Sequence, residues 1–451
     1  MFPNQFSASL WGDEAFSAVL SQKPLWEMIR IVSRDTSPPL YYLSEHFWFK
    51  IFGNSELAIR SLSFIFHLGT ALILFLLAKM LWDKKTALWA AILGFLNPFL
   101  FTYAFEGRMY ALLALTTTLS FYGYFQAFFG KQKYRFKWKL FYAVTAALAL
   151  YSHHFAIFAI FVQGIGVLAL FINKILKEKL SPVKTFFTLA WPFFLTLFFY
   201  IPWLPSLYYQ IMLVKGGFWL GKPDFKDLLE LTRKFLVGAQ TYQLKSLVLT
   251  LTILAVLCRR WQLKNMVDKI LLFWFLAPLV LTWLISQMTQ SIFFDRYMLF
   301  AIPATALILV SRRRIFISPL IISLLIVIFI GIDWQYFTHP TKGPFRQLVA
   351  SVKQEQKPTD ALINWNSAAH HLWETKYYGL IAPIYSPGGP LPFFVGTSQM
   401  TQDDVVYLPP QNQRIGVITS GPAEEVKLNG YYQSELKQFD GLKVIWLTQN
   451  H

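Results

Sequence analysis

The sequence predicts an all-α polytopic membrane bundle of about ten spans, followed by a small C-terminal mixed α/β domain. Hydrophobic residues make up 55% of the 451 residues and charged residues only 14%, which is typical of an integral membrane protein. Apolar segments recur from residue 62 to residue 333, and the composition becomes polar after that point. Lys and Arg gather in every second connection between these segments.

The predicted spans are apolar segments near the length of a membrane helix. They lie near residues 62–81, 86–105, 109–129, 140–152, 155–176, 185–204, 245–258, 270–288, 297–310 and 315–331. Several approach the ~20 residues needed to cross the hydrocarbon. The shorter ones need tilt, local thinning or burial among neighbouring helices.

The basic connections define the predicted topology. They contain Lys84, Lys85, Lys131, Lys133, Arg135, Lys137, Lys139, Lys174, Lys177, Lys179, Lys184, Arg259, Arg260, Lys264, Lys269, Arg312, Arg313 and Arg314. Short loops rich in Lys and Arg stay on the cytoplasmic side, so both chain ends are predicted to be extracytoplasmic. The net charge of +17 therefore reflects topology and contact with membrane lipids, and we expect no nucleic-acid partner. The single cysteine, Cys258, excludes an intrachain disulfide.

Three regions are expected. Residues 1–61 form an external amphipathic loop region with an acidic motif, 62–333 form the transmembrane bundle, and 334–451 form a soluble extracytoplasmic domain. Apolar spacing predicts helices over 14–20 and 40–51. In the last region we expect strands at 361–365, 414–419 and 443–447, and helices at 367–378 and 423–439. No hydrophobic segment precedes the external residues, so we expect an upstream helix to be missing from this sequence.

Adjacent carboxylates at Asp13 and Glu14 are the first candidate for chemistry. Neighbouring side chains cannot share one helix face, so one can face a substrate while the other binds a cation, an arginine or a backbone group. Partial desolvation near the membrane interface raises the pKa of a carboxyl and makes it a better base. The pair taken alone favours the simpler interpretation, a helix N-cap.

Asp35 precedes Pro38 and Pro39, which fix a turn, and Tyr41 follows. This segment is either a rigid connection with interfacial aromatics or part of a site, and its length favours the second interpretation.

Two arginines and two histidines lie in predicted external hairpins. Arg108 and Arg296 can bind phosphate through two parallel hydrogen bonds, or extend to lipid headgroups. Arginine on this side opposes the positive-inside bias, which modestly favours a function. His153 and His154 are adjacent, without the helical spacing of zinc ligands, so a structural use is favoured.

Nucleotide-binding motifs are absent from the sequence, which has no P-loop and no GxGxxG before a helix. The donor of a transferase would therefore not be a nucleotide in a Rossmann domain. Paired carboxylates and histidines permit a divalent metal ion, but nothing in the sequence requires one.

Several strings resemble the GT-C superfamily of integral-membrane glycosyltransferases, family 39 type, which includes protein O-mannosyltransferase-like and RgtA/B/C/D-like enzymes. They are WGDEA, DTSPPLYYL, FGNSELAIRS, EGRMYALLAL, ALYSHHFAIF and FFDRYMLFAIP, in this order over roughly residues 10–310. One departure is Ser37, where many relatives have His before the two prolines. The missing upstream helix corresponds to the first helix of the family bundle.

The resemblance implies transfer of a sugar from a polyprenyl-phosphate donor to an acceptor hydroxyl at the outer face of the cell membrane. The acceptor would be a glycan, a lipid or a protein. Asp13 would be the general base, with Glu14 as its partner or alternative, and the donor phosphate would bind Arg108 and Arg296. The remaining candidates, for substrate binding, are Asp35, Tyr41, Tyr110, His153, His154 and Tyr297.

Two other functions stay open. A transporter or lipid-linked-sugar translocase would need polar groups at mid-bilayer and broken helices. Asn97, Pro98 and Gln163 are such positions, but the spans carry few charges, which favours interfacial chemistry. A non-catalytic envelope assembly protein with the same fold is the third hypothesis.

Overall fold

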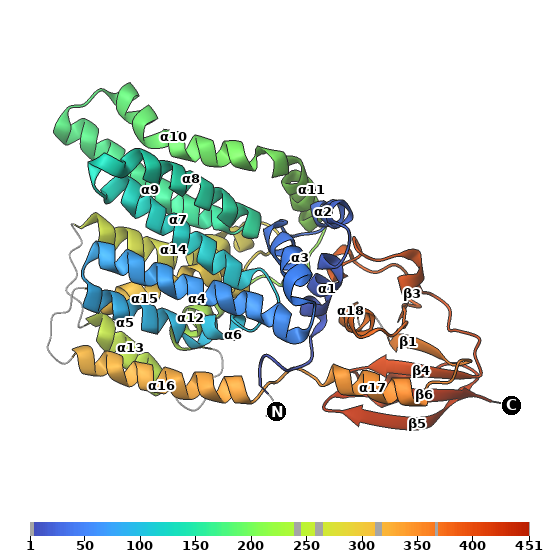
Figure 1. The fold of residues 1–451 in the computed structure, drawn as a ribbon. Helices are drawn as coiled ribbons and strands as arrows, with labels where there is room; N and C mark the ends of the chain where they lie inside the picture. Colours follow the sequence, from blue (N-terminus) through green and yellow to red (C-terminus); the bar gives the residue numbers. More distant parts are fainter. Residues whose placement is uncertain (1–3, 239–244, 258–264, 312–317, 366–368, 451) are drawn as a thin grey trace. The chain divides into compact units, whose positions relative to one another are not determined.

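The computed structural model describes residues 4–238, 245–257, 265–311, 318–365 and 369–450 (Figure 1). The candidate residues Cys258, Arg259, Arg260, Lys264, Arg312, Arg313 and Arg314 lie outside this part. The chain divides into two compact units. The first, called the loop–sheet unit, comprises Met1–Thr36, Tyr42–Arg60 and Thr338–His451; the second, the helical unit, comprises Ser37–Tyr41 and Ser61–Phe337.

The helical unit is built from apolar helices and short 3-10 turns. Its elements are α4 (Glu56–Leu81, from Ser61 on), α5 (Lys84–Phe95), α6 (Pro98–Tyr103), α7 (Tyr110–Phe129), η1 (Gln132–Tyr134), α8 (Arg135–Ser152), α9 (Ala156–Glu178), α10 (Pro182–Tyr200), η2 (Ile201–Trp203), α11 (Leu204–Lys215), α12 (Phe225–Val237), α13 (Lys245–Leu257), α14 (Met266–Met288), η3 (Asp295–Ala301), α15 (Ile302–Val310) and α16 (Ser318–Thr338).

Five helices in the described part are long and apolar enough to cross a membrane. They are Glu56–Leu81, Ala156–Glu178, Pro182–Lys215, Met266–Met288 and Pro319–Thr338. The other predicted spans fall on shorter or less apolar helices. The segment 86–105 divides into α5 and α6 because Asn97 is extended and caps the new helix, with the Leu100 N–H donating to its Oδ1 at 3.0 Å. The protein is therefore a helical membrane protein, as predicted.

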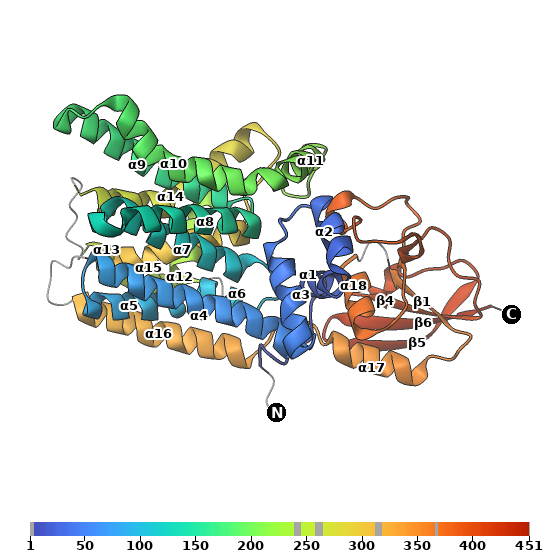
Figure 2. The same ribbon diagram turned by 45° about the horizontal axis from the view of Figure 1, so that its top comes forward.

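An aromatic contact links α14, α7 and η3 in the core of the helical unit. The Trp274 ring stacks on Phe121, with centroids 3.7 Å apart, and its Nε1 donates to the Phe300 carbonyl at 2.9 Å. Helix α7 packs against α8, and α14 packs against α9 and α15. Figures 1 and 2 show α7 and α8 side by side in both views.

Buried amides join further helices in this unit. The Gln163 Oε1 on α9 accepts from the Tyr142 hydroxyl at 3.0 Å, and its Nε2 donates to the Ser120 Oγ at 2.9 Å. Asn97 Nδ2 donates to the Phe235 carbonyl at 3.0 Å. The amides that a translocase would use for transport thus have partners inside the bundle.

Within the described residues, the loop–sheet unit combines five α-helices with one six-stranded sheet. The elements are α1 (Gly12–Ser21), α2 (Leu25–Ser33), α3 (Leu40–Phe52, from Tyr42 on), α17 (Phe345–Glu355), α18 (Ala369–Tyr378), β1 (Ala361–Trp365), β2 (Ile384–Tyr385), β3 (Val405–Val406), β4 (Arg414–Thr419), β5 (Tyr431–Phe439), β6 (Leu442–Gln449) and the short 3-10 turns η4 (Phe393–Val395), η5 (Gln402–Asp404) and η6 (Ala423–Glu425). The helices predicted over 14–20, 40–51 and 367–378 are confirmed within the described residues, as are all three predicted strands.

The strand order is β3-β2-β1-β4-β6-β5, with β5 and β6 antiparallel to their neighbours. Successive residues face opposite sides. On β1, Leu362 belongs to a buried cluster with α17, while Ile363 belongs to a second cluster across the sheet. Helix α17 covers the first side of the sheet (Figure 2).

The helix predicted over 423–439 is wrong. Residues 423–425 form the single turn η6, residues 426–430 form a loop, and β5 occupies Tyr431–Phe439. Asp440 and Gly441 connect β5 to β6 with positive φ angles of 44° and 89°, the pattern of a two-residue hairpin turn. Pairing with β6 therefore overrides the weak helical spacing of this edge strand.

Candidate active site

The acidic motif lies in the first turn of α1. Trp11 is extended before the helix, and its N–H donates to the Glu14 Oε2 at 3.4 Å. The helix-cap interpretation therefore applies to Glu14. This carboxylate is 0% exposed, so it needs further partners inside the protein.

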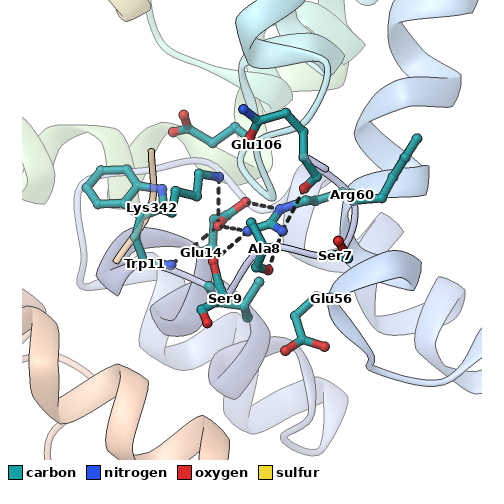
Figure 3. A network of polar contacts seen from close by, with 12 residues as sticks. Ser7, Ala8, Ser9, Trp11, Glu14, Glu56, Arg60, Glu106 and Lys342 are labelled. Atoms are coloured by element: carbon teal, nitrogen blue, oxygen red, sulfur yellow. Dashed lines mark hydrogen bonds and ion pairs between the residues drawn. The ribbon is translucent and has the colours of Figure 1, made fainter. Parts of the chain in front are cut away.

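Arg60, fully buried in the first turns of α4, supplies those partners (Figure 3). Its Nε donates to the Glu14 Oε1 at 3.1 Å and one Nη2 hydrogen to the Glu14 Oε2 at 2.8 Å. The other hydrogens donate to the carbonyls of Gln5, Ala8 and Ser9. All five guanidinium N–H groups thus have an acceptor, which is the full capacity of arginine.

A second cation completes the environment of Glu14. The Lys342 Nζ lies 2.9 Å from the Glu14 Oε2 (Figure 3). Both carboxylate oxygens of Glu14 are thus held by cations and a backbone N–H. The contacts are those of a structural carboxylate that anchors the loop before α1.

Asp13 differs from its neighbour. Its side chain is 20% exposed, and the His370 Nδ1 of α18 lies 3.9 Å from the Asp13 Oδ1. It lies at the second position of α1, where unbonded backbone N–H groups favour negative charge.

The first turn of α1 packs closely on α18. A Cβ on Gly12 would lie 2.4 Å from the His370 Cβ, so only glycine fits here. Two buried groups of α18 are shifted in pKa. Burial, then the charge of Glu14, raises the Glu374 pKa well above its ordinary value, and burial, then His370, lowers the His371 pKa to about 4.

A second anchor in this unit was missed by the sequence analysis. The Glu56 Oε1 accepts from the Arg346 Nε at 3.0 Å and from the Tyr378 hydroxyl at 2.9 Å. Tyr378 in turn accepts from the Leu10 N–H at 2.9 Å. Glu56 and Arg60 both lie in the string FGNSELAIRS, so two charged residues at the start of an apolar helix were the available signal.

Asp35 and Tyr41 fall in different units. Asp35 is 8% exposed in the loop–sheet unit, and Tyr41 is fully buried in the helical unit.

In the helical unit the two hairpins that were predicted to be external meet. The Arg296 Nη1 lies 3.8 Å from the Glu106 Oε1, and its guanidinium lies over the rings of Phe294 and Tyr110 at 4.9 and 5.4 Å. Asp295 accepts from the Arg296 N–H at 2.7 Å and pairs with the Lys234 Nζ at 3.1 Å. Lys234 on α12 is a cation that sequence reasoning missed.

His153 joins this group. Its ring centroid lies 5.0 Å from that of Tyr297 and 6.4 Å from that of Tyr110. Burial, then His154 and the arginines Arg108 and Arg296, lower the His153 pKa well below its ordinary value. The structure thus brings five predicted site residues together: Arg108, Tyr110, His153, Arg296 and Tyr297. We call them the hairpin cluster.

His154 belongs to a separate hydrogen-bonded chain. Its Nδ1 lies 3.2 Å from the Tyr200 hydroxyl and its Nε2 lies 2.7 Å from the Gln210 Oε1. Because the amide oxygen only accepts, Nε2 carries the proton and Nδ1 accepts from Tyr200. Gln210 Nε2 then donates to the Ser37 carbonyl at 3.4 Å, so the Nε2 atom of His154 is linked through Gln210 to the residue before the two prolines.

Metal-ligating side chains do not cluster in the described part of the chain. No group of three or more His, Cys, Asp or Glu there has the arrangement needed to hold an ion.

Comparisons with known proteins agree on the architecture. Residues 36–205 match the model of the family described as dolichyl-phosphate-mannose-protein mannosyltransferase. No curated protein sequence matches the chain. ArnT from Cupriavidus metallidurans in the apo state is 12% identical, with a TM-score of 0.66 over 98% of this chain and 94% of that one. ArnT bound to undecaprenyl phosphate is 13% identical, with a TM-score of 0.60 over the same shares.

A third match is more partial. The Archaeoglobus fulgidus oligosaccharyltransferase complex with Zn and sulfate is 13% identical, with a TM-score of 0.53 over 91% of this chain and 64% of that chain. The three structures share a fold with this chain at low identity. The chain therefore has the GT-C fold, and the family model matched over residues 36–205 agrees with the family 39 resemblance predicted from the sequence.

Proposed function

We propose that this protein is a membrane glycosyltransferase that moves a hexosyl or pentosyl group from a polyprenyl-phosphate donor to an acceptor hydroxyl, at the outer face of the cell membrane. The main support for this proposal is the difference in environment between Asp13 and Glu14. Both oxygens of Glu14 are occupied by Arg60 and Lys342, whereas Asp13 is partly exposed beside them. The GT-C fold and a relative of that fold crystallised with undecaprenyl phosphate support the donor class.

Asp13 acts as the general base in this proposal. The acceptor oxygen attacks the anomeric carbon, its proton passes to the Asp13 carboxylate, and the bond from that carbon to the phosphate oxygen breaks with its electron pair. The products are the glycosylated acceptor and polyprenyl phosphate. Helix α1 keeps Asp13 in place because the adjacent Glu14 is fixed by two cations.

The hairpin cluster provides the charge that this leaving group needs. The phosphate gains negative charge as the glycosidic bond breaks, and arginine binds phosphate through planar, bidentate hydrogen bonds. We assign this role to Arg108 and Arg296. Arg296 is held by aromatic faces and by a carboxylate at 3.8 Å, an arrangement that can accommodate a second anion.

The aromatic members of the cluster suit a sugar. Tyr110 and Tyr297 are stacked with centroids 6.4 Å apart, and His153 lies beside them as a neutral imidazole. We assign these three to the sugar, together with Asp35 and Tyr41. His154 has the supporting role of positioning the Ser37 segment through Gln210. The acceptor is a glycan, a lipid or a protein.

Substitution of the proposed base tests this function. Asp13→Asn should lower turnover roughly 10²–10⁴-fold, the usual contribution of a general base, without a change in Tm. The measurement is release of radiolabelled sugar from a panel of polyprenyl-phosphate donors, with crude envelope acceptors and purified protein in lipid. Glu27→Gln is the control. Glu27 is an exposed carboxylate of the same unit and forms an ion pair with Lys23. Equal transfer by wild type and Asp13→Asn would refute the assignment.

A further inference from the structure

A cavity of about 710 Å³ lies at the end of the helical unit that carries the basic connections. It is formed where α4 and α7 end and where α8 and α14 begin. Leu81, Phe129 and Val267 provide its apolar wall. Helix α7 has 20 residues and begins at Tyr110 of the hairpin cluster, so the cavity is roughly 30 Å from that cluster. It is therefore not part of the proposed donor site.

The remaining lining residues of the cavity are mostly polar or aromatic. They include Gln126, Lys131, Tyr134 and Trp138. The Tyr122 hydroxyl accepts from the Gln126 Nε2 at 3.2 Å, and its ring meets the Trp138 ring edge-on at 5.4 Å. These contacts fix the Gln126 amide and the Trp138 indole in place. Lys131 is the cation among these lining residues.

The connection that carries Lys131 contains several Lys and Arg residues and no Asp or Glu. It also contains Lys133, Arg135 and Lys137. Lys133 lies over the Tyr134 ring at 5.7 Å, which places its charge beside the cavity wall. Among the described residues, no carboxylate pairs with these four cations. The Arg135 Nε is buried there without an acceptor.

We propose that this cavity binds the headgroup phosphate of an anionic phospholipid from the surrounding leaflet. The phosphate would meet Lys131 and Lys133, the headgroup hydroxyls would meet Gln126, and the first acyl carbons would contact the apolar wall. Basic pockets between membrane helices on the cytoplasmic side are known to take such headgroups, and aromatic residues with polar tips suit this depth. A zwitterionic headgroup would bring its own cation against the lysines, so the site discriminates by charge.

Native mass spectrometry of the full-length protein tests the lipid. The protein is offered phosphatidylglycerol and phosphatidylcholine with identical acyl chains. We expect wild type to retain phosphatidylglycerol roughly tenfold more strongly. Removing two of the charges by Lys131→Gln with Lys133→Gln should abolish this preference, since each cation near a headgroup contributes on the order of 1 kcal/mol.

Two variants separate the cavity from general surface charge. Lys177→Gln with Lys184→Gln removes two exposed charges from another basic connection and should leave the preference intact. Val267→Trp fills the apolar wall, keeps every charge, and should lower lipid binding. Equal retention of both lipids, or equal loss in the Lys177/Lys184 control, would overturn the proposal. Displacement of the lipid by millimolar inorganic phosphate would also overturn it, by assigning the site to a free anion.

Discussion

Two arginines, one in each unit, are held in contrasting ways. Arg60 donates all five N–H groups to oxygens at 2.5–3.1 Å, two of them to one carboxylate. Arg296 lies over two aromatic rings, with its ion-pair partner at 3.8 Å. The same side chain serves as a saturated structural anchor in the first case. In the second it keeps a geometry in which a ligand can compete for its hydrogen bonds.

The contrast helps to distinguish structural arginines from ligand-binding arginines in this fold. A buried arginine whose every donor has a protein acceptor has no capacity left for a substrate. An arginine stacked on rings is kept charged and oriented at a small cost in hydrogen bonds. Stability and activity should therefore respond to these two residues in opposite ways.

The largest effect is expected from Arg60→Met. The substitution keeps an unbranched apolar side chain but leaves three carbonyls without donors and removes one of the two cations around Glu14. Loss of one partner of a buried pair costs about 3–5 kcal/mol. Thermal unfolding in detergent should show a large fall in Tm.

Arg346→Met is the matched control for this experiment. Arg346 belongs to the same unit, but its side chain is 51% exposed where it pairs with Glu56. Its loss should cost about 1 kcal/mol or less. A small Tm change for both variants would remove the distinction drawn for Arg60.

Arg296→Met should act on the ligand instead of the fold. We expect Tm to stay near that of wild type and the affinity for polyprenyl phosphate to fall roughly tenfold to a hundredfold, the loss of one charge-assisted contact. Equilibrium binding of a fluorescent polyprenyl phosphate measures this. An unfolded variant would place Arg296 with Arg60 as a structural residue.

Gly12→Ala sharpens the comparison inside the loop–sheet unit. The new methyl would lie 2.4 Å from the His370 Cβ and 2.7 Å from its Cα, so α1 and α18 must separate. Such overpacking costs about 1–3 kcal/mol. We expect a lower Tm and reduced transfer because Asp13 adjoins the displaced turn; an unchanged Tm would argue against this packing. Gly388→Ala is the control in the same unit, because Gly388 has open space around it and no positive φ angle.

The smallest expected effect is the pH dependence of stability that comes from the buried Glu374 of α18, in the same unit as Arg60. The folded-state pKa of Glu374 is raised, so the folded protein keeps a proton that the unfolded chain loses above about pH 4.5. Stability therefore falls as pH rises. Glu374→Gln should remove this loss and gain on the order of 1 kcal/mol relative to wild type at pH 8, with less gain at pH 5.

His371→Gln gives the opposite sign and serves as the control. The folded-state pKa of His371 is lowered to about 4, so wild type loses stability as pH falls from 6.5 to 4. The variant should gain at pH 5 and change little at pH 8. Parallel unfolding curves for both variants across this range would contradict the assigned environments.

The sequence predicted the elements that have a strong local signal. Strands β1 and β4 and helices α1 and α3 follow from apolar periodicity, and the positions of the hairpin residues follow from the order of the spans. Strand β5 was missed because its residues are mostly exposed, and its identity depends on pairing with β6 across Asp440 and Gly441.

The candidate site was predictable in its residue types but not in its connections. Asp13 and Glu14 are equivalent in sequence, and only the folded chain shows that Glu14 meets Arg60, 46 positions away. Lys342 gave no signal because its partner lies at the other end of the chain. Ion pairs between residues far apart in the sequence leave no local sequence pattern, so they cannot be predicted from the sequence alone.

The wide separation of these contacts has a consequence for synthesis in the cell. The pair of Glu14 and Arg60 can form once the first described span has been made, but the contact between Leu10 and Tyr378 joins residues 368 positions apart. The N-terminal segment therefore stays incompletely packed until residue 378 has been synthesised. During that interval α1 lacks the surface of α18 on which it packs, and termination before residue 369 would leave it without that partner.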